Sequence, residues 1–258
     1  LSPRTDKIVG RKKEIKDIKK AIKETDTRRV LYFVAEGGIG KTRLLQEVDN
    51  LRKRWCVHII DLYHQKNHSP SGLRRAIVDN LGENRFPEYT KQRIAFEKKR
   101  GIGRRGKDLE ELRAALDDIF VQEYNRIAAR WRIILRFDTL ELLQYEHDSV
   151  QDTCLVNDVD TVVKNWLLRI IPKLQNTITI FAGRPRPQTE QEFQATYTNA
   201  GCLFTRYELP AFSEKESKQY LDLMRQKFPQ QLDQILLSNE PPDTFGVSEG
   251  KPIRLALI

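Results

Sequence analysis

Short apolar runs alternate with longer stretches of helical periodicity along most of the chain. Five runs have the length of strands: RRVLYFVAE (28–36), CVHIIDLY (56–63), RWRIILRFD (130–138), TITIFAGR (177–184) and CLFTRYEL (202–209). Between them, apolar residues recur every three or four positions, as in RKKEIKDIKKAIKET (11–25), whose other face is rich in lysine. This alternation predicts an α/β fold, with a five-stranded, mainly parallel sheet and helices on both faces.

The same patterns predict how the chain is divided into helices, an insertion and two domains. Further helices are predicted at 41–55, 69–82, 90–99, 107–130 and 158–174. Residues 83–130 carry no strand signal and form a predicted basic helical insertion. After Pro210 only helical patterns follow, so we expect a nucleotide-binding domain at 1–209 and a small all-helical lid domain at 210–258. The first residue, Leu1, and the apolar ending PIRLALI predict a piece of a longer protein, with the lid truncated at its C-terminus.

A glycine-rich stretch supplies the strongest candidate chemistry. VLYFVAEGGIGKTRLLQEV (30–48) passes from a predicted strand through three glycines into a predicted helix. Glycines let backbone N–H groups curl around an anion, and a helix N-terminus adds free N–H groups and a positive dipole end. AEGGIGKT matches the P-loop pattern, except that Ala35 replaces the first glycine. The pattern predicts that Lys41 reaches the β- and γ-phosphates and that the Thr42 hydroxyl holds Mg²⁺.

Three further residues follow predicted strands. Asp138 ends the run IILRFD and is the predicted second magnesium ligand. The next position, where many P-loop ATPases carry a water-activating acid, is Thr139, and the nearest acid is Glu141. Arg184 ends the fourth strand and is predicted to sense the γ-phosphate. Because the second acid is displaced to Glu141, we expect only slow ATP hydrolysis.

Composition narrows the class of protein. The chain has 258 residues, 39% hydrophobic residues and a formal net charge of +9. Its apolar runs are shorter than the roughly 20 residues that span a bilayer, so we expect no membrane partner. The cysteines at 56, 154 and 202 lack metal-ligand spacing, which indicates reduced thiols and a cytoplasmic protein. A basic segment favours a weak nucleic-acid partner through Lys98, Lys99, Arg100, Arg104, Arg105 and Lys107.

The order of the motifs resembles that of the STAND-class signal-transduction ATPases, including NB-ARC and NACHT proteins. The motifs are IVGRKKEI, EGGIGKTRLL, IILRFDTLE, FAGRP, ELPAFSEKESKQYL and SEGKPIRLAL. The resemblance implies ATP or ADP with Mg²⁺ as ligands, and a switch from an ADP-closed monomer to an ATP-open form that self-associates and signals. It implies these nucleotide contacts: Val9, Gly10, Arg11, Gly37, Gly38, Ile39, Gly40, Lys41, Thr42, Arg43 and Pro252.

This resemblance has two departures. Arg43 stands where many relatives have a second threonine, so a hydroxyl contact to the α-phosphate is lost and only the backbone N–H remains. Thr139 after Asp138 resembles some bacterial members more than the eukaryotic ones.

Two other functions fit the same sequence. An origin-initiator-like AAA+ ATPase that loads on DNA also has a VGR-like box and a helical lid, and Arg254 is then the lid arginine that touches phosphate. The second alternative is a nucleic-acid-binding module that uses the basic 98–107 loop. The GKP motif and the missing second acid favour the switch over the initiator, and no aromatic residues interleave with the charges of the loop to stack bases.

Overall fold

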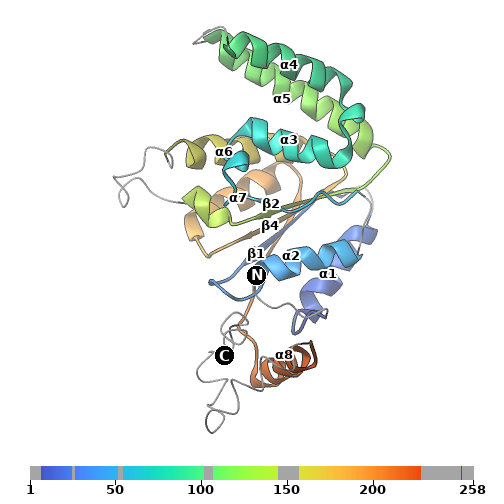
Figure 1. Cartoon of the computed structure of the whole chain (residues 1–258), viewed down its shortest axis with the longest axis vertical. Helices are drawn as coiled ribbons and strands as arrows, with labels where there is room; N and C mark the ends of the chain where they lie inside the picture. Colours follow the sequence, from blue (N-terminus) through green and yellow to red (C-terminus); the bar gives the residue numbers. More distant parts are fainter. Residues whose placement is uncertain are drawn as a thin grey trace.

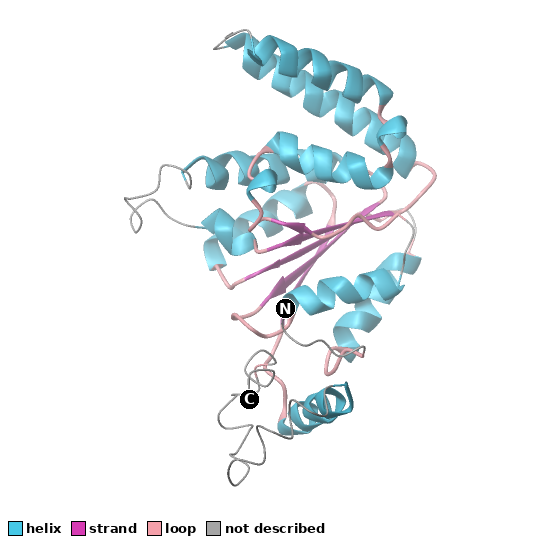
Figure 2. Cartoon of the chain, viewed as in Figure 1, coloured by secondary structure: helices cyan, strands magenta, loops and turns pink. Residues whose placement is uncertain are grey.

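The computed structural model describes residues 7–24, 27–51, 55–101, 107–144, 157–227 and 251 (Figure 1). A five-stranded sheet forms its middle layer (Figure 2), in the order β2-β3-β4-β1-β5 with every neighbouring pair parallel. The strands are β1 (Arg29–Val34), β2 (Ile60–Asp61), β3 (Ile133–Asp138), β4 (Thr177–Gly183) and β5 (Leu203–Glu208). The predicted α/β fold with a parallel five-stranded sheet is thereby confirmed.

Helices cover both faces of the sheet, as the apolar runs predict. Successive strand residues point to opposite faces, so Tyr32 of β1 belongs to one buried cluster while Leu31 and Phe33 belong to the other. The face of Leu31 is covered by α1 (Lys12–Lys23) and α2 (Lys41–Leu51). The opposite face is covered by α3 (Pro70–Leu81), α6 (Asn157–Ile170) and α7 (Pro187–Asn199) (Figure 1).

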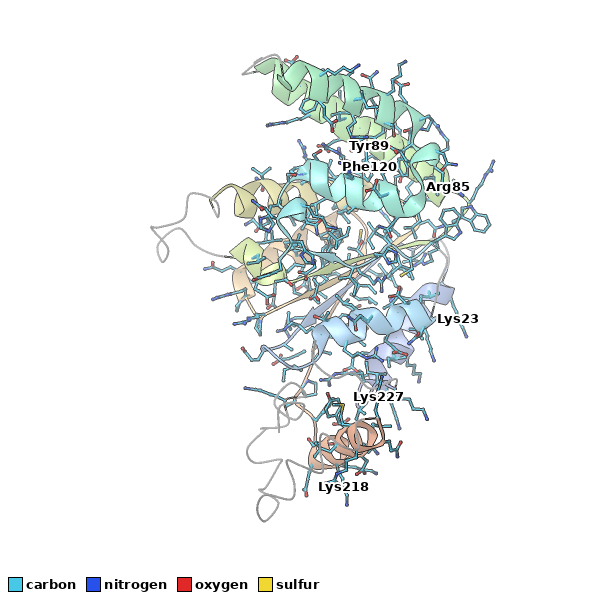
Figure 3. The ribbon with its side chains drawn as sticks, in the orientation of Figure 1. Lys23, Arg85, Tyr89, Phe120, Lys218 and Lys227 are labelled. Carbon is cyan, nitrogen blue, oxygen red and sulfur yellow. The ribbon has the colours of Figure 1, made fainter. Side chains whose placement is uncertain are left out.

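The predicted insertion is a helical hairpin of α4 (Pro87–Gly101) and α5 (Lys107–Ala128), which projects beyond α3 (Figure 1). Its base is apolar: Tyr89 and Phe120 are buried with their rings 5.9 Å apart (Figure 3). The buried carboxylate of Glu123 accepts hydrogen bonds from the backbone N–H groups of Glu88 (3.2 Å) and Tyr89 (2.9 Å). It thus satisfies two of the unpaired donors at the start of α4, which joins the two helices at their base.

A buried arginine holds α2 against the sheet. Arg136 lies in β3 and is fully buried, although a strand interior normally takes an apolar residue. Its guanidinium donates to the carbonyl oxygens of Leu45 (2.7 Å) and Val57 (2.9 and 3.1 Å) and to the carboxylate of Asp49 (2.7 Å). Several donors of the buried cation are therefore paired, as burial of a charge requires. The contacts position the helix that begins at Lys41.

Two secondary-structure expectations need correction. The second strand, expected at 56–63, is reduced to Ile60–Asp61 plus an isolated bridge at Cys56, because the ladder with β3 is broken between them. The chain between the fourth and fifth strands forms α7, which we did not predict. The available signal was Pro187 in the first helical turn, with Phe193 and Tyr197 buried one turn apart on the same side.

The other elements are close to expectation. Helix α3 begins after Ser69, whose side chain accepts the Gly72 N–H, and ends at Gly82, whose φ is 99°. Helix α8 (Glu214–Lys227) begins shortly after Pro210, the expected domain boundary. Ser213 and Glu216 form a reciprocal capping box at its start. Short 3₁₀ segments occur at Gln65–Asn67, Glu83–Arg85, Leu140–Gln144 and Ile171–Lys173. Of the helical patterns expected after Pro210, those beyond Lys227 fall outside the described residues, apart from residue 251.

Candidate nucleotide-binding site

The glycine-rich loop lies between β1 and α2, as its sequence predicts. Gly38 (φ 81°) and Gly40 (φ 96°) occupy backbone conformations that other residues rarely adopt. The loop leads directly into α2, whose first N–H groups have no acceptor within the helix. Backbone N–H groups and the positive end of the helix dipole therefore gather at one point, which suits a phosphate group.

Lys41 and the loop already contact each other. Lys41 Nζ donates to the carbonyl oxygens of Ala35 (2.6 Å) and Glu36 (3.0 Å). Burial lowers the pKa of Lys41 from its ordinary value, and the nearby carboxylates of Glu141 and Asp138 act in the opposite direction. The ammonium group is thus held beside the loop by carbonyl oxygens that phosphate oxygens can replace.

Thr42 and Asp138 lie together, although they are 96 positions apart in the sequence. The Thr42 hydroxyl donates to Asp138 Oδ2 at 2.6 Å. Asp138 is buried, and burial raises its pKa, while hydrogen bonds from Thr42 and the Thr139 N–H lower it. A hydroxyl and a carboxylate at this place provide the oxygen ligands that Mg²⁺ prefers, so the two residues fit the predicted metal site.

Glu141 and Arg184 complete the group. Arg184 Nε lies 3.5 Å from Glu141 Oε1, and the other Glu141 oxygen, Oε2, is buried without a hydrogen-bond partner among the described residues. The Arg184 guanidinium also lies close to the loop, since a Cβ added at Gly37 would lie 3.5 Å from Nη2. At Gly183 a Cβ would lie 2.9 Å from Leu140 Cβ, so the glycine permits β4 to end against the segment that carries Glu141.

Asp61 belongs to the site, although the sequence analysis did not predict it, and Thr139 links it to Asp138. Thr139 has φ 63°, an uncommon value for a β-branched residue. Its N–H donates to Asp138 Oδ1 (2.9 Å) and its hydroxyl donates to Asp61 Oδ1 (2.7 Å). Asp61 ends β2 beside Asp138 in the parallel register. Asp61 ends an apolar run, CVHIID, as Asp138 ends IILRFD, and this position is the sequence signal that points to it.

The segment of Val9, Gly10 and Arg11, which the family resemblance makes a nucleotide contact, lies between the loop and α8. Val9 is buried and belongs to a small cluster with Phe212, and Gly10 has φ 71°. The Arg11 guanidinium is buried and donates to the carbonyl oxygens of Ile39 (3.1 Å) and Pro210 (2.8 Å). The structure therefore brings the segment to the glycine-rich loop, and its contact with the nucleotide remains a prediction.

Other predicted residues are outside this group or outside the described residues. The Arg43 side chain points along α2 and pairs with Glu47 at 3.0 Å, which leaves its predicted backbone contact untested. Pro252 and Arg254 fall outside the described residues. Among the basic-loop residues, Lys98 is exposed, while Arg104 and Arg105, and the side chains of Lys99, Arg100 and Lys107, are not described.

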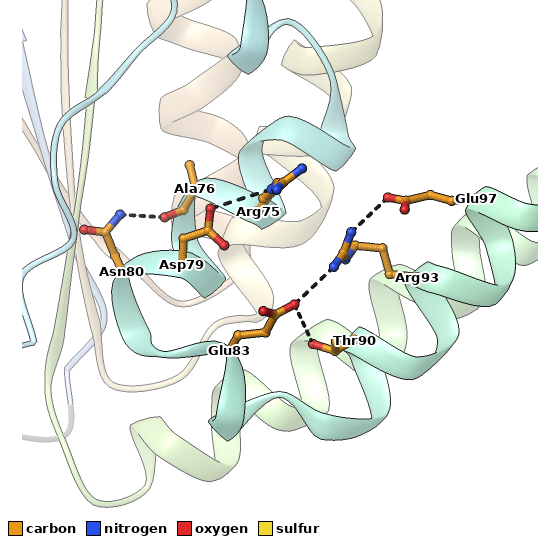
Figure 4. Close-up of polar contacts among 8 residues, drawn as sticks. All are labelled: Arg75, Ala76, Asp79, Asn80, Glu83, Thr90, Arg93 and Glu97. Atoms are coloured by element: carbon orange, nitrogen blue, oxygen red, sulfur yellow. Dashed lines mark hydrogen bonds and ion pairs between the residues drawn. The ribbon is translucent and has the colours of Figure 1, made fainter.

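Charged side chains of the described part of α4 pair with one another and with the preceding turn. Arg93 of α4 pairs with Glu83 (3.1 Å) and with Glu97 (3.0 Å), as Figure 4 shows. Glu83 also accepts a hydrogen bond of 3.5 Å from the Thr90 hydroxyl. The Arg93 guanidinium is therefore occupied by two carboxylates.

Three observations concern other kinds of site, namely metal clusters, membrane-spanning helices and reactive thiols. Within the described part of the chain, no cluster of three or more His, Cys, Asp or Glu residues has the arrangement of a metal site. The same part of the chain has no helix long and apolar enough to cross a membrane. Cys56 and Cys202 form no disulfide within the described residues, and burial raises the pKa of Cys202, which makes that thiol less reactive.

Two solved structures resemble this fold. The ORC1 protein of Aeropyrum pernix, solved in complex with DNA, aligns with a TM-score of 0.55 and 14% identity over 97% of this chain and 58% of its own. The ORC2 protein of the same organism, solved as ADPNP–ADP complexes, aligns with a TM-score of 0.51 and 12% identity over 99% of this chain and 62% of its own. No protein-family model and no curated protein matches the sequence.

The sheet, the glycine-rich loop and these two likenesses define the class of the fold. It is an α/β P-loop NTPase fold that resembles the fold of the two ORC proteins, as the strand and helix pattern together with the glycine-rich motif predicted. The chain spans about three fifths of the length of the two ORC proteins. At this level of identity the likeness concerns the fold, and it favours no feature specific to the STAND class.

Proposed function

We propose that this chain is the nucleotide-binding module of a P-loop ATPase, and that it binds ADP or ATP together with Mg²⁺. The observation that carries the proposal is the meeting of three groups at one edge of the sheet. They are the glycine-rich loop with Lys41, the hydrogen-bonded pair Thr42 and Asp138 at 2.6 Å, and Arg184. The ADPNP–ADP complexes of the ORC2 protein support an adenine nucleotide as the ligand.

Each group has a defined part in this proposal. The loop N–H groups and Lys41 bind the phosphates, and Thr42 and Asp138 hold Mg²⁺. Bound Mg²⁺ neutralises charge on the β- and γ-phosphates. Because Arg184 pairs with Glu141, a γ-phosphate competes with that carboxylate for the guanidinium, which provides a way to distinguish ATP from ADP. The direct test is titration of a fluorescent ADP analogue with and without Mg²⁺, and failure to bind in both conditions rejects the proposal.

ATP hydrolysis is expected to be slow, well below the typical enzyme turnover of about 10 per second. Thr139 is not an acid, and its hydroxyl is engaged with Asp61, while Glu141 is paired with Arg184. A water molecule without a well-placed base gains little activation.

The Arg184→Ala substitution should leave ADP affinity unchanged and weaken ATP binding several-fold.

Steady-state phosphate release and competitive titration measure these effects. Arg186→Ala is the matched control, because Arg186 lies two residues away and is exposed. Rapid turnover that Glu141→Gln abolishes would contradict the expectation of slow hydrolysis and would identify Glu141 as the catalytic base. Equal losses of ADP and ATP affinity in Arg184→Ala would contradict a role for Arg184 at the γ-phosphate.

We further propose that residues 210–258 form a helical lid whose position depends on the bound nucleotide, within a larger cytoplasmic protein that self-associates in the ATP state. The last strand ends at Glu208 and α8 begins at Glu214, which supports a division near Pro210. We consider two biological uses of this proposed module. One is a signalling switch of the STAND type, which the motif order supports. The other is an initiator-type ATPase that loads on DNA, which the two ORC structures support better.

DNA binding separates the two uses. In the initiator-type use, the protein should bind duplex DNA in an ATP-dependent manner, and the affinity should fall steeply between about 50 and 200 mM salt because counterions are released. Removing three charges from the basic loop (Lys98, Arg104 and Arg105 to alanine) should reduce the salt dependence, whereas removing Lys218, an exposed residue of α8 (Figure 3), should not. No binding at low salt, with or without ATP, would eliminate the initiator-type use and leave the switch.

A further inference from the structure

The peptide group between Ile39 and Gly40 has a buried cation on one side. Arg11 Nη2 donates to the Ile39 carbonyl oxygen at 3.1 Å. The described chain has no cis peptide bond, and in a trans peptide the C=O and N–H groups point in opposite directions. A hydrogen bond that fixes the Ile39 carbonyl toward Arg11 therefore turns the Gly40 N–H away from Arg11. Gly40 can adopt the required φ of 96° because it has no side chain.

The same guanidinium nitrogen also binds the segment that leads into α8. Arg11 Nη2 donates to the Pro210 carbonyl oxygen at 2.8 Å, and Arg11 Cζ lies 5.4 Å from the centre of the Phe212 ring. The preceding residue, Leu209, is still attached to the sheet, because its N–H donates to the Val34 carbonyl oxygen at 2.9 Å. Arg11 thus holds the chain immediately after it leaves the sheet and before α8 begins.

The surroundings leave Arg11 little freedom. Its exposed fraction is 5%, and the carboxylates of Glu14 and Glu216 face the buried charge. At the neighbouring Gly10, an added Cβ would lie 2.7 Å from Glu216 Oε1, so this segment fits closely against α8. Val9 and Phe212 form the centre of a small apolar cluster that is separate from the two larger cores and also includes Tyr220, Leu221 and Leu223.

We propose that Arg11 is a positioning residue that orients the Ile39–Gly40 peptide for phosphate binding and ties α8 to the same loop. The first part rests on the proposed nucleotide-binding function. The carbonyl oxygens of Ile39 and Pro210 accept from the same atom, Arg11 Nη2. A ligand that displaces the loop therefore changes the contact that holds α8, and release of α8 loosens the loop. Contact of this side chain with the nucleotide is not required.

The orienting role is tested with ADP and adenosine. Arg11→Gln removes the charge but keeps a polar side chain, and it should weaken ADP binding about three- to tenfold while adenosine binding is unchanged, since only ADP needs the phosphate loop. Arg11→Lys should recover little, because a single ammonium group does not reproduce the planar fork of arginine. Lys12→Gln removes an exposed charge from the next residue and serves as the matched control. Equal losses for ADP and adenosine, or no loss of ADP affinity, would overturn this role.

The tie to α8 is tested without any ligand. Hydrogen exchange of the peptide that covers Glu214–Lys227 should be faster in Arg11→Gln than in the wild type and in Lys12→Gln, while exchange in β1 and β4 is unchanged. Unchanged exchange in α8 would remove the tie. If the wild-type protein binds neither ADP nor adenosine, the proposed function and the orienting role fail together, and exchange in the ligand-free protein still decides whether Arg11 holds α8.

Discussion

Replacing Lys41 with alanine is expected to weaken ADP and ATP binding about ten- to a hundredfold, because a charge-assisted contact to a phosphate is worth about 1.5–3 kcal/mol. Nζ is already held at the loop by the carbonyl oxygens of Ala35 (2.6 Å) and Glu36 (3.0 Å), so little side-chain ordering is needed when phosphate arrives. Titration of a fluorescent nucleotide analogue measures the loss.

Lys23→Ala is the matched control for this prediction. Lys23 is an exposed lysine in the last turn of α1 (Figure 3), so its removal lowers the net charge equally without touching the loop. The pH dependence provides a second measurement. Because burial lowers the pKa of Lys41, phosphate affinity should decline at a lower alkaline pH than an exposed lysine would give, and Lys41→Ala should lose that decline. Equal affinities of the wild type and Lys41→Ala would reject the phosphate site.

The Asp117→Ala substitution is expected to lower the free energy of unfolding by about 3–5 kcal/mol, because it leaves a buried guanidinium without its carboxylate. Asp117 of α5 is buried and accepts hydrogen bonds from Arg74 of α3, from Trp166 Nε1 (2.8 Å) and from Arg169 (2.7 Å), both of α6. Arg74 is itself buried. The carboxylate therefore joins three helices at the base of the hairpin.

Thermal and urea unfolding measure this effect, and the melting temperature should fall by roughly 6–20 °C. Asp118→Ala removes the exposed neighbouring carboxylate and should change stability by less than about 0.5 kcal/mol. The double substitution Arg74→Met with Asp117→Leu should recover much of the loss, because it removes both buried charges together. A loss in Asp117→Ala no larger than in Asp118→Ala would show that the network contributes little.

The core of the site was predictable because three motifs follow strands of one parallel sheet. In such a sheet the carboxyl ends of the strands lie along the same edge. The loop after β1, Arg184 after β4 and Asp138 at the end of β3 therefore meet in the strand order β3-β4-β1. The sequence predicted each residue from its motif, and the parallel topology explains why Thr42 and Asp138 are in hydrogen-bond contact.

Other parts of the site required the tertiary structure. The hydrogen bond that the Thr139 hydroxyl donates to Asp61 depends on a two-residue strand and on an unusual backbone conformation at Thr139, neither of which leaves a periodic pattern. Helix α7 was missed because its sequence is mostly polar, and only Phe193, Tyr197 and Glu190 are buried in it. The pattern of buried residues is too sparse there to reveal a helix without knowledge of its neighbours.

The class of fold and the position of the glycine-rich loop could be predicted from the sequence, because strand and helix periods and glycine conformations are local properties of the chain. The tertiary structure alone decided which polar groups face one another. Arg136 in a strand, Asp117 in a helix and Arg11 before a helix carry no local sign of their partners, which lie 40 to 200 positions away for most of their hydrogen bonds. Such pairs form because a buried charge must find a partner wherever the folded chain provides one.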